Sequence, residues 1–90
     1  MGIRESRARA LADGHHQQFL SDPTLDAAQR QYMYEIHDPN GPAWTGSYRS
    51  FRAGQEARDQ IKRLVAHQHG VTEAHLSRAE DAYMIRMLCV

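Results

Sequence analysis

The sequence has one cysteine, no long apolar run and no excess of charge of either sign. Because Cys89 is alone, an internal disulfide is excluded, and we expect a cytoplasmic protein in a reducing compartment. No stretch approaches the roughly 20 apolar residues of a membrane span, so we expect no membrane association. Residues 1–14 contain arginines without the apolar segment of a secretory signal. Eleven basic residues balance eleven acidic ones, which leaves no global attraction to nucleic-acid backbones.

Sequence motifs for catalysis and cofactor binding are also missing. The chain contains no GxSxG, Walker-type or GxGxxG loop, and its acidic residues are scattered. Cys89 with a histidine would make a nucleophilic dyad, but a lone cysteine on an expected strand is typical of a small core residue. Without a catalytic constellation, we predict no enzyme activity and no cofactor.

The six histidines in 90 residues are an unusual feature of the composition. A structural zinc site needs three or four converging ligands, commonly cysteines, and the chain has no second cysteine. His67 and His69 point about 200° apart if their helix continues through them, so they would not chelate together. We expect them instead to favour the negative end of the helix dipole, and we predict no metal site.

The segment with the clearest periodicity is 53–69, and it predicts a central helix. Lys62 and Arg63 fall on the expected solvent face, and Gly70 follows where a left-handed C-terminal cap is favourable. The apolar stripe is narrow and begins with alanines, so we expect this helix to lie close against a sheet. The residues of the stripe recur at helical spacing: Ala53, Ala57, Ile61, Leu64, Val65 and Gln68.

Residues 1–31 are predicted to form a helical N-terminal segment. A first helix is expected to kink or end near Gly14 and to resume after it. Asp22 is the expected cap of a second helix, with Pro23 as its first residue and Gln31 near its end.

The pattern then changes to one that predicts a β-hairpin over residues 32–52. Aromatic and apolar residues alternate from 32 to 36, as in a half-buried strand. The sequence Asp-Pro-Asn-Gly-Pro at 38–42 is the strongest turn signal in the chain. A second strand is expected over 44–51.

The C-terminal residues support two interpretations. Ser-Arg-Ala-Glu at 77–80 matches a capping box, which favours a helix to the end of the chain. Residues 82–90 are short, apolar and partly β-branched, which favours a third strand. We prefer the strand, because it extends the sheet over the central helix.

The predicted fold is therefore a single small α+β domain in which helices pack on a three-stranded antiparallel sheet. A right-handed crossover places the third strand beside the first, in the order 2-1-3. The predicted core consists of Ile36, Ile61, Leu64, Val65, Ile85 and Leu88.

The chain has no catalytic motif, no metal-binding spacing and no excess of positive charge. Binding through surface shape and apolar contacts is therefore the function that remains. Aromatic residues and arginines, which are enriched at interface hot spots, gather on the expected hairpin and its flanks. We therefore predict a non-enzymatic module that binds a protein partner, or a second copy of the chain, as an inhibitor or adaptor. The predicted binding residues are Tyr34, Trp44, Tyr48, Arg49 and Arg52.

Two further observations bear on function. A small, neutral, motif-free chain is similar in format to phage- or mobile-element-encoded inhibitors of host defence, such as anti-CRISPRs, although the likeness covers no motif. Aromatics interleaved with arginines on an open sheet would also stack unpaired bases, so single-stranded RNA or DNA is the alternative partner. The balanced net charge makes nucleic acid the weaker of the two alternatives.

Overall fold

The computed structural model describes residues 14–44 and 51–88. Residues 14–18 are helical and lead into a short 3-10 helix, η1 (Phe19–Ser21). Three α-helices follow, which are α2 (Ala27–Ile36), α3 (Phe51–His69) and α4 (Glu73–Leu88). No strand occurs in the two described ranges, so the predicted α+β fold with its three-stranded sheet is wrong.

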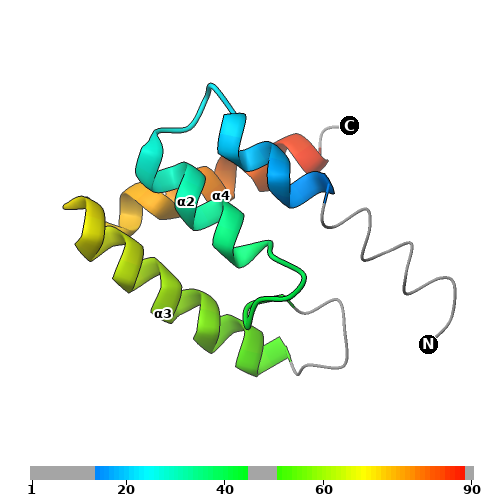
Figure 1. Cartoon of the computed structure of the whole chain (residues 1–90), viewed down its shortest axis with the longest axis vertical. Helices are drawn as coiled ribbons and strands as arrows, with labels where there is room; N and C mark the ends of the chain where they lie inside the picture. Colours follow the sequence, from blue (N-terminus) through cyan, green and yellow to red (C-terminus); the bar gives the residue numbers. More distant parts are fainter. Residues whose placement is uncertain (1–13, 45–50, 89–90) are drawn as a thin grey trace, which may run out of the picture.

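Helix α2 is the centre of the arrangement. It packs against η1, α3 and α4, and Figure 1 shows it between the N-terminal helical residues and α3, with α4 behind it. Its buried residues lie on one helix face, because they recur every three or four positions. The core that forms around this face contains Phe19, Leu25, Ala28, Tyr32, Met33, Ile36, Ala43, Val65, Ala66, Leu76 and Ala79.

The residues predicted as the first strand, 32–36, are the second half of α2. A capping box begins this helix, because the Asp26 carboxylate accepts a hydrogen bond from the Gln29 N–H (2.9 Å) and the Gln29 side chain accepts one from the Asp26 N–H (3.2 Å). The helix therefore starts later than predicted. Asp22, the predicted cap, instead accepts a hydrogen bond from the Thr24 N–H (2.9 Å) in the connection before α2.

The predicted turn at residues 38–42 is confirmed, but it follows a helix and not a strand. Within it, the Gly41 N–H donates to the Asp38 carbonyl and the Asn40 N–H donates to the Asp38 carboxylate, both at 2.9 Å. The predicted second strand, 44–51, is largely outside the described residues. Of its two described ends, one lies in the connection and the other begins α3.

The predicted central helix is confirmed as α3, and it begins two residues before the predicted start at position 53. Its predicted C-terminal cap is also confirmed. Gly70 has a φ of 66°, which a residue with a side chain rarely adopts. The N–H groups of Gly70 and Val71 donate to the carbonyls of His67 (3.3 Å) and Ala66 (3.0 Å), which are the two bonds of a Schellman motif.

The buried face of α3 differs from the predicted stripe. Val65 is buried as predicted and Ile61 packs against the core, whereas Leu64 is 63% exposed. The face is rotated toward Lys62, which was expected in solvent and whose side chain is only 17% exposed. This rotation brings the Lys62 ammonium to Glu80 on α4.

The residues predicted as the third strand, 82–90, continue helix α4 as far as Leu88, so this prediction is wrong; residues 89 and 90 lie outside the described ranges. The alternative interpretation, a helix, describes these residues correctly. The helix begins at Glu73, where Thr72 Oγ1 accepts a hydrogen bond from the His75 N–H (3.1 Å). The start is therefore earlier than the capping box at 77–80 indicated.

The buried residues of α4 are Leu76 and Ala79. Ile85 and Leu88, both predicted in the core, are exposed because they lie on the last two turns and on the helix face away from the core. Across 14–44 and 51–88, no helix combines the length and the apolar content needed to cross a membrane.

Candidate binding surfaces

Large apolar side chains face solvent on the last two turns of α4. Met84, Ile85, Met87 and Leu88 are each between 57% and 79% exposed, and we call these four residues the α4 apolar surface. Tyr83 is the side chain at this end of α4 that packs against the core. Exposed apolar side chains gathered in one place mark contact sites in soluble proteins.

A groove of about 400 Å³ lies beside the α4 apolar surface. Helix α4 lines the groove with two small residues, Ala79 and Ala82, and with the larger, exposed Ile85. The surface therefore offers a partner both a projecting side chain and a shallow hollow. The groove is lined by Thr24, Leu25, Gln29, Arg78, Ala79, Ala82, Ile85 and Arg86.

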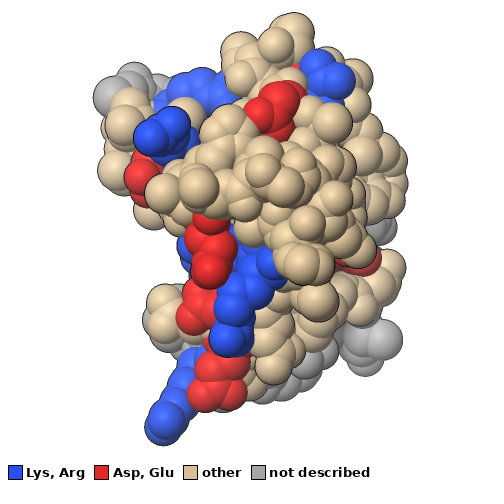
Figure 2. All heavy atoms as spheres, turned by 90° about the vertical axis from the view of Figure 1, so that its left-hand side faces the viewer, with Lys and Arg blue, Asp and Glu red and all other residues tan. Residues whose placement is uncertain are grey.

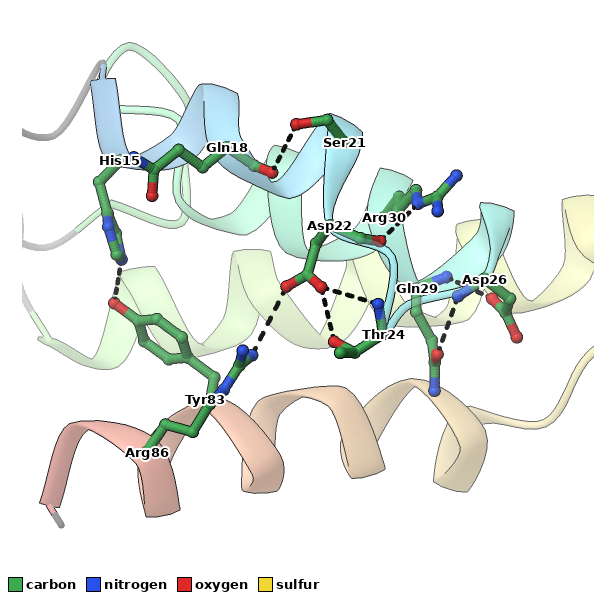
Figure 3. Close-up of polar contacts among 10 residues, drawn as sticks. All are labelled: His15, Gln18, Ser21, Asp22, Thr24, Asp26, Gln29, Arg30, Tyr83 and Arg86. Atoms are coloured by element: carbon green, nitrogen blue, oxygen red, sulfur yellow. Dashed lines mark hydrogen bonds and ion pairs between the residues drawn. The ribbon is translucent and has the colours of Figure 1, made fainter.

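Two arginines of α4, Arg78 and Arg86, line the groove. Arg86 forms an ion pair with Asp22 at 3.6 Å, and Figure 3 shows this contact joining α4 to the connection before α2. The hydrogen bonds from Thr24, together with Arg86, lower the pKa of Asp22. The Arg30 Nε donates to the Asp22 carbonyl (2.9 Å), which ties the same connection to α2. One wall of the groove is therefore held in place by polar contacts.

A second polar cluster joins α2, α3 and α4 around Glu80. The Lys62 ammonium lies 3.1 Å from Glu80 Oε1, the Arg58 Nη1 lies 3.2 Å from Oε2, and the Tyr32 hydroxyl donates to Oε1. The Lys62 Nζ is also 5.7 Å from the centre of the Tyr32 ring. Three helices are thus connected through one carboxylate.

The ionisation states in this cluster follow from its contacts. Burial alone would raise the pKa of Glu80, but the hydrogen bonds from Tyr32 and Lys62 and the charges of Lys62 and Arg58 outweigh it and lower that pKa. Burial, together with Glu80, raises the pKa of the Tyr32 hydroxyl. At neutral pH the cluster therefore holds one carboxylate, two cations and a neutral tyrosine.

A cavity of about 240 Å³ opens beside this cluster. Arg58 and Glu80 supply its charged groups, and the remaining side chains are apolar or aromatic, with one histidine. Trp44, the single tryptophan of the chain, is among them. The lining residues are Met33, Ile36, His37, Ala43, Trp44, Arg58, Glu80, Tyr83 and Met84.

Aromatic and imidazole rings pack together where η1, α2 and α4 meet. The centre of the Tyr83 ring lies 5.5 Å from that of Phe19 and 5.0 Å from that of His37, and the His15 imidazole hydrogen-bonds to the Tyr83 hydroxyl (Figure 3). His37 Nδ1 donates to the Met33 carbonyl at 2.8 Å. Burial lowers the pKa of His37, so its ring is neutral at neutral pH.

The other histidines with polar contacts in the described ranges also hold elements together. His16 is buried, donates from Nδ1 to the Tyr34 carbonyl (2.8 Å) and stacks on the Tyr34 ring. His75 on α4 contacts the Asp26 carboxylate at the start of α2. His69 hydrogen-bonds to Gln31 at 2.7 Å. Five of the six histidines thus contribute ring packing or contacts between elements of the described structure.

The predicted binding residues do not form one surface in the described residues. Tyr34 lies on α2, where its ring stacks on His16. Trp44 lines the cavity beside Glu80. Arg52 is exposed on α3 and forms an ion pair with Glu56 four residues later (3.4 Å). Tyr48 and Arg49 lie outside the described residues.

Sequence reasoning missed both the Glu80 cluster and the α4 apolar surface. Arg58 and Lys62 are four residues apart, which places them on one side of a helix, but nothing in the sequence names their partner on α4. Ile85 and Leu88 were assigned to the core because a strand was preferred there. The capping-box signal at 77–80 favoured a helix, and in a helix these two residues lie on the face away from the core.

Within the described residues, no three His, Cys, Asp or Glu side chains converge into a group able to hold a metal ion. Comparison with family models, with curated proteins and with solved structures found no match to this chain. The arguments for function therefore rest on the surfaces described above.

Proposed function

We propose that this chain is a non-catalytic protein-binding module, an inhibitor or adaptor, that engages its partner through the α4 apolar surface. The observation that supports this is the exposure of Met84, Ile85, Met87 and Leu88 on two consecutive helical turns. Burying one such side chain contributes roughly 1.5–3 kcal/mol. Methionines adapt their shape to a partner more readily than branched residues do.

The spacing of these residues suggests the kind of partner. Met84 and Leu88 are four residues apart, and Ile85 and Leu88 are three apart, which is the anchor spacing of a helix that lies in an apolar groove of another protein. The exposed Arg78 and Asp81 precede this end of α4 and carry opposite charges, so the rim favours neither an acidic nor a basic partner. We therefore propose a partner with an apolar groove, in the cytoplasm, where Cys89 would stay reduced.

Nucleic acid is the weaker proposal, because no observation on the described residues favours it. Arg52, which was expected to contact phosphate, is paired with Glu56. On the face of the molecule in Figure 2, basic and acidic side chains alternate. Alternating charges give little attraction to a phosphate backbone.

The experiment is an affinity capture from a lysate of the native host cell with three forms of the tagged full chain. The wild type is compared with the double variant Ile85→Ser/Leu88→Ser and with Leu64→Ser, a matched control that removes an equally exposed leucine from α3. We expect the double variant to lose the captured protein and the control to keep it. Circular dichroism confirms that all three are folded.

Light scattering at several concentrations tests a second copy of the chain as the partner. In that case the wild type and Leu64→Ser would form a dimer that the double variant does not form. Equal capture by all three forms would contradict the proposal, and so would the absence of both a captured protein and a dimer.

A further inference from the structure

In the described residues, the polar cluster beside the cavity pairs two basic side chains with one carboxylate. Arg58 and Lys62 both contact the Glu80 carboxylate, and the pairs are 3.2 Å and 3.1 Å long. Two cations share one anion, so the three groups in direct contact sum to a charge of +1. Tyr32 and His37 beside them are neutral. A further anion, Asp59, acts on Tyr32, but it is exposed on α3 and is not among the residues that line the cavity.

Arg58 is the cation that faces the cavity. It lines the cavity and its side chain is 32% exposed, whereas Lys62 is not among the lining residues and its side chain is 17% exposed. A guanidinium has five N–H donors, and Glu80 is the one acceptor that the described residues provide for Arg58. Donors therefore remain for an anion.

The rest of the cavity is suited to an apolar group. Trp44, Tyr83 and the side chains of Met33, Ile36 and Met84 line it. A cavity of roughly 150 Å³ accommodates benzene, so about 240 Å³ leaves room for one aromatic ring with a short acidic arm. A cationic ligand would meet the Arg58 guanidinium, and the Glu80 oxygens already accept from three donors.

We propose that this cavity binds a small carboxylate carried on an aromatic or aliphatic group, with Arg58 contacting the carboxylate and Trp44 and Tyr83 contacting the apolar part. The cavity and the α4 apolar surface are separate sites that share one residue, Met84. The cavity would give the chain a small-molecule site in addition to its protein-binding surface.

Titration of the wild-type full chain with phenylacetate and with phenylacetamide tests the proposal. The two probes have nearly the same shape and differ in charge. A charge-assisted hydrogen bond is worth enough that we expect phenylacetate to bind about tenfold or more tightly than the amide. The fluorescence of Trp44 reports binding, and chemical-shift changes at His37, Ala43 and Met84 locate it.

The matched variants are Arg58→Met and Arg63→Met, both on α3, of which only Arg58 lines the cavity. Arg58→Met leaves Lys62 to neutralise Glu80, so the fold is expected to persist. We expect it to abolish the preference for phenylacetate, while Arg63→Met keeps it. Equal affinity of the wild type for the two probes, or shifts confined to the groove at Thr24 and Ala82, would overturn the proposal without reference to any variant.

Discussion

We expect the substitution Glu80→Gln to lower the free energy of unfolding by roughly 2–4 kcal/mol. Glutamine keeps the shape of the side chain and still offers Tyr32 a carbonyl acceptor, but it removes the negative charge that Arg58 and Lys62 share. Removing one partner of a buried ion pair costs roughly 3–5 kcal/mol. We expect a lower range because the Arg58 side chain is 32% exposed and can turn toward solvent, whereas Lys62 is largely buried.

Thermal melts followed by circular dichroism at neutral pH measure this cost. In a chain of this length each 1 kcal/mol corresponds to roughly 4–8 °C, so the melting temperature should fall by about 8 °C or more. Glu73→Gln is the control, because Glu73 is exposed in the first turn of the same helix and contributes only about 0.5 kcal/mol through the helix dipole. Replacing Lys62 by Met in the Glu80→Gln background should restore part of the loss. If Glu80→Gln and the Glu73→Gln control had the same melting temperature, the ion pairs at Glu80 would not form.

Three further predictions concern the fold and its dependence on pH. In urea unfolding, Leu76→Ala should lower the free energy of unfolding by roughly 2–5 kcal/mol, because Leu76 is fully buried. Leu88→Ala should lower it by less than about 0.5 kcal/mol, because Leu88 is exposed. Equal losses would contradict the orientation of α4. The pKa of Glu80 is lowered on folding, so its stabilisation is present above its ordinary value of 4.5 and is lost as the pH falls below it. Acid titrations of stability should therefore be steeper for the wild type than for Glu80→Gln, and parallel curves would argue against this linkage. Gly70→Ala, at a φ of 66°, should cost roughly 1–2 kcal/mol in thermal melts, while Gly14→Ala, a helical position with open space around it, should be neutral or stabilising.

The sequence predicts helix α3 well because its evidence is local. A long periodic pattern and a following glycine define the helix and its C-terminal cap without reference to any other element. The rotation of its buried face was not predictable in the same way. It depends on Glu80, which lies 18 positions after Lys62 and reaches it only once α4 has packed.

The strand predictions failed where a short apolar run fits two periods. Tyr32 and Ile36 are four residues apart, which suits both an alternating strand and a helix face. Ala28 and Met33 extend the helical spacing, and the Asp26–Gln29 capping box supplies a start. In α2 these local signals and the packing of three neighbouring elements favour the helix.

The candidate site was missed for a related reason. Treating residues 82–90 as a strand placed Ile85 and Leu88 in a core. In the helix, Tyr83 packs against the core, while Ile85 and Leu88 are exposed. The aromatic residues suggested a binding surface on the expected hairpin, but the Tyr34 ring stacks on the His16 ring inside the protein's own fold. Exposure is a property of the packed helices, and the composition of a segment does not reveal it.

The most direct test of the proposed function is the affinity of the chain for the protein that it captures, measured by calorimetry. Ile85→Ser/Leu88→Ser removes two side chains that each contribute roughly 1.5–3 kcal/mol when buried, so the dissociation constant should rise by about 100-fold or more. Leu64→Ser should leave that constant unchanged, because Leu64 lies on α3, away from the α4 apolar surface. A dissociation constant that is the same for the wild type and the double variant would contradict the account.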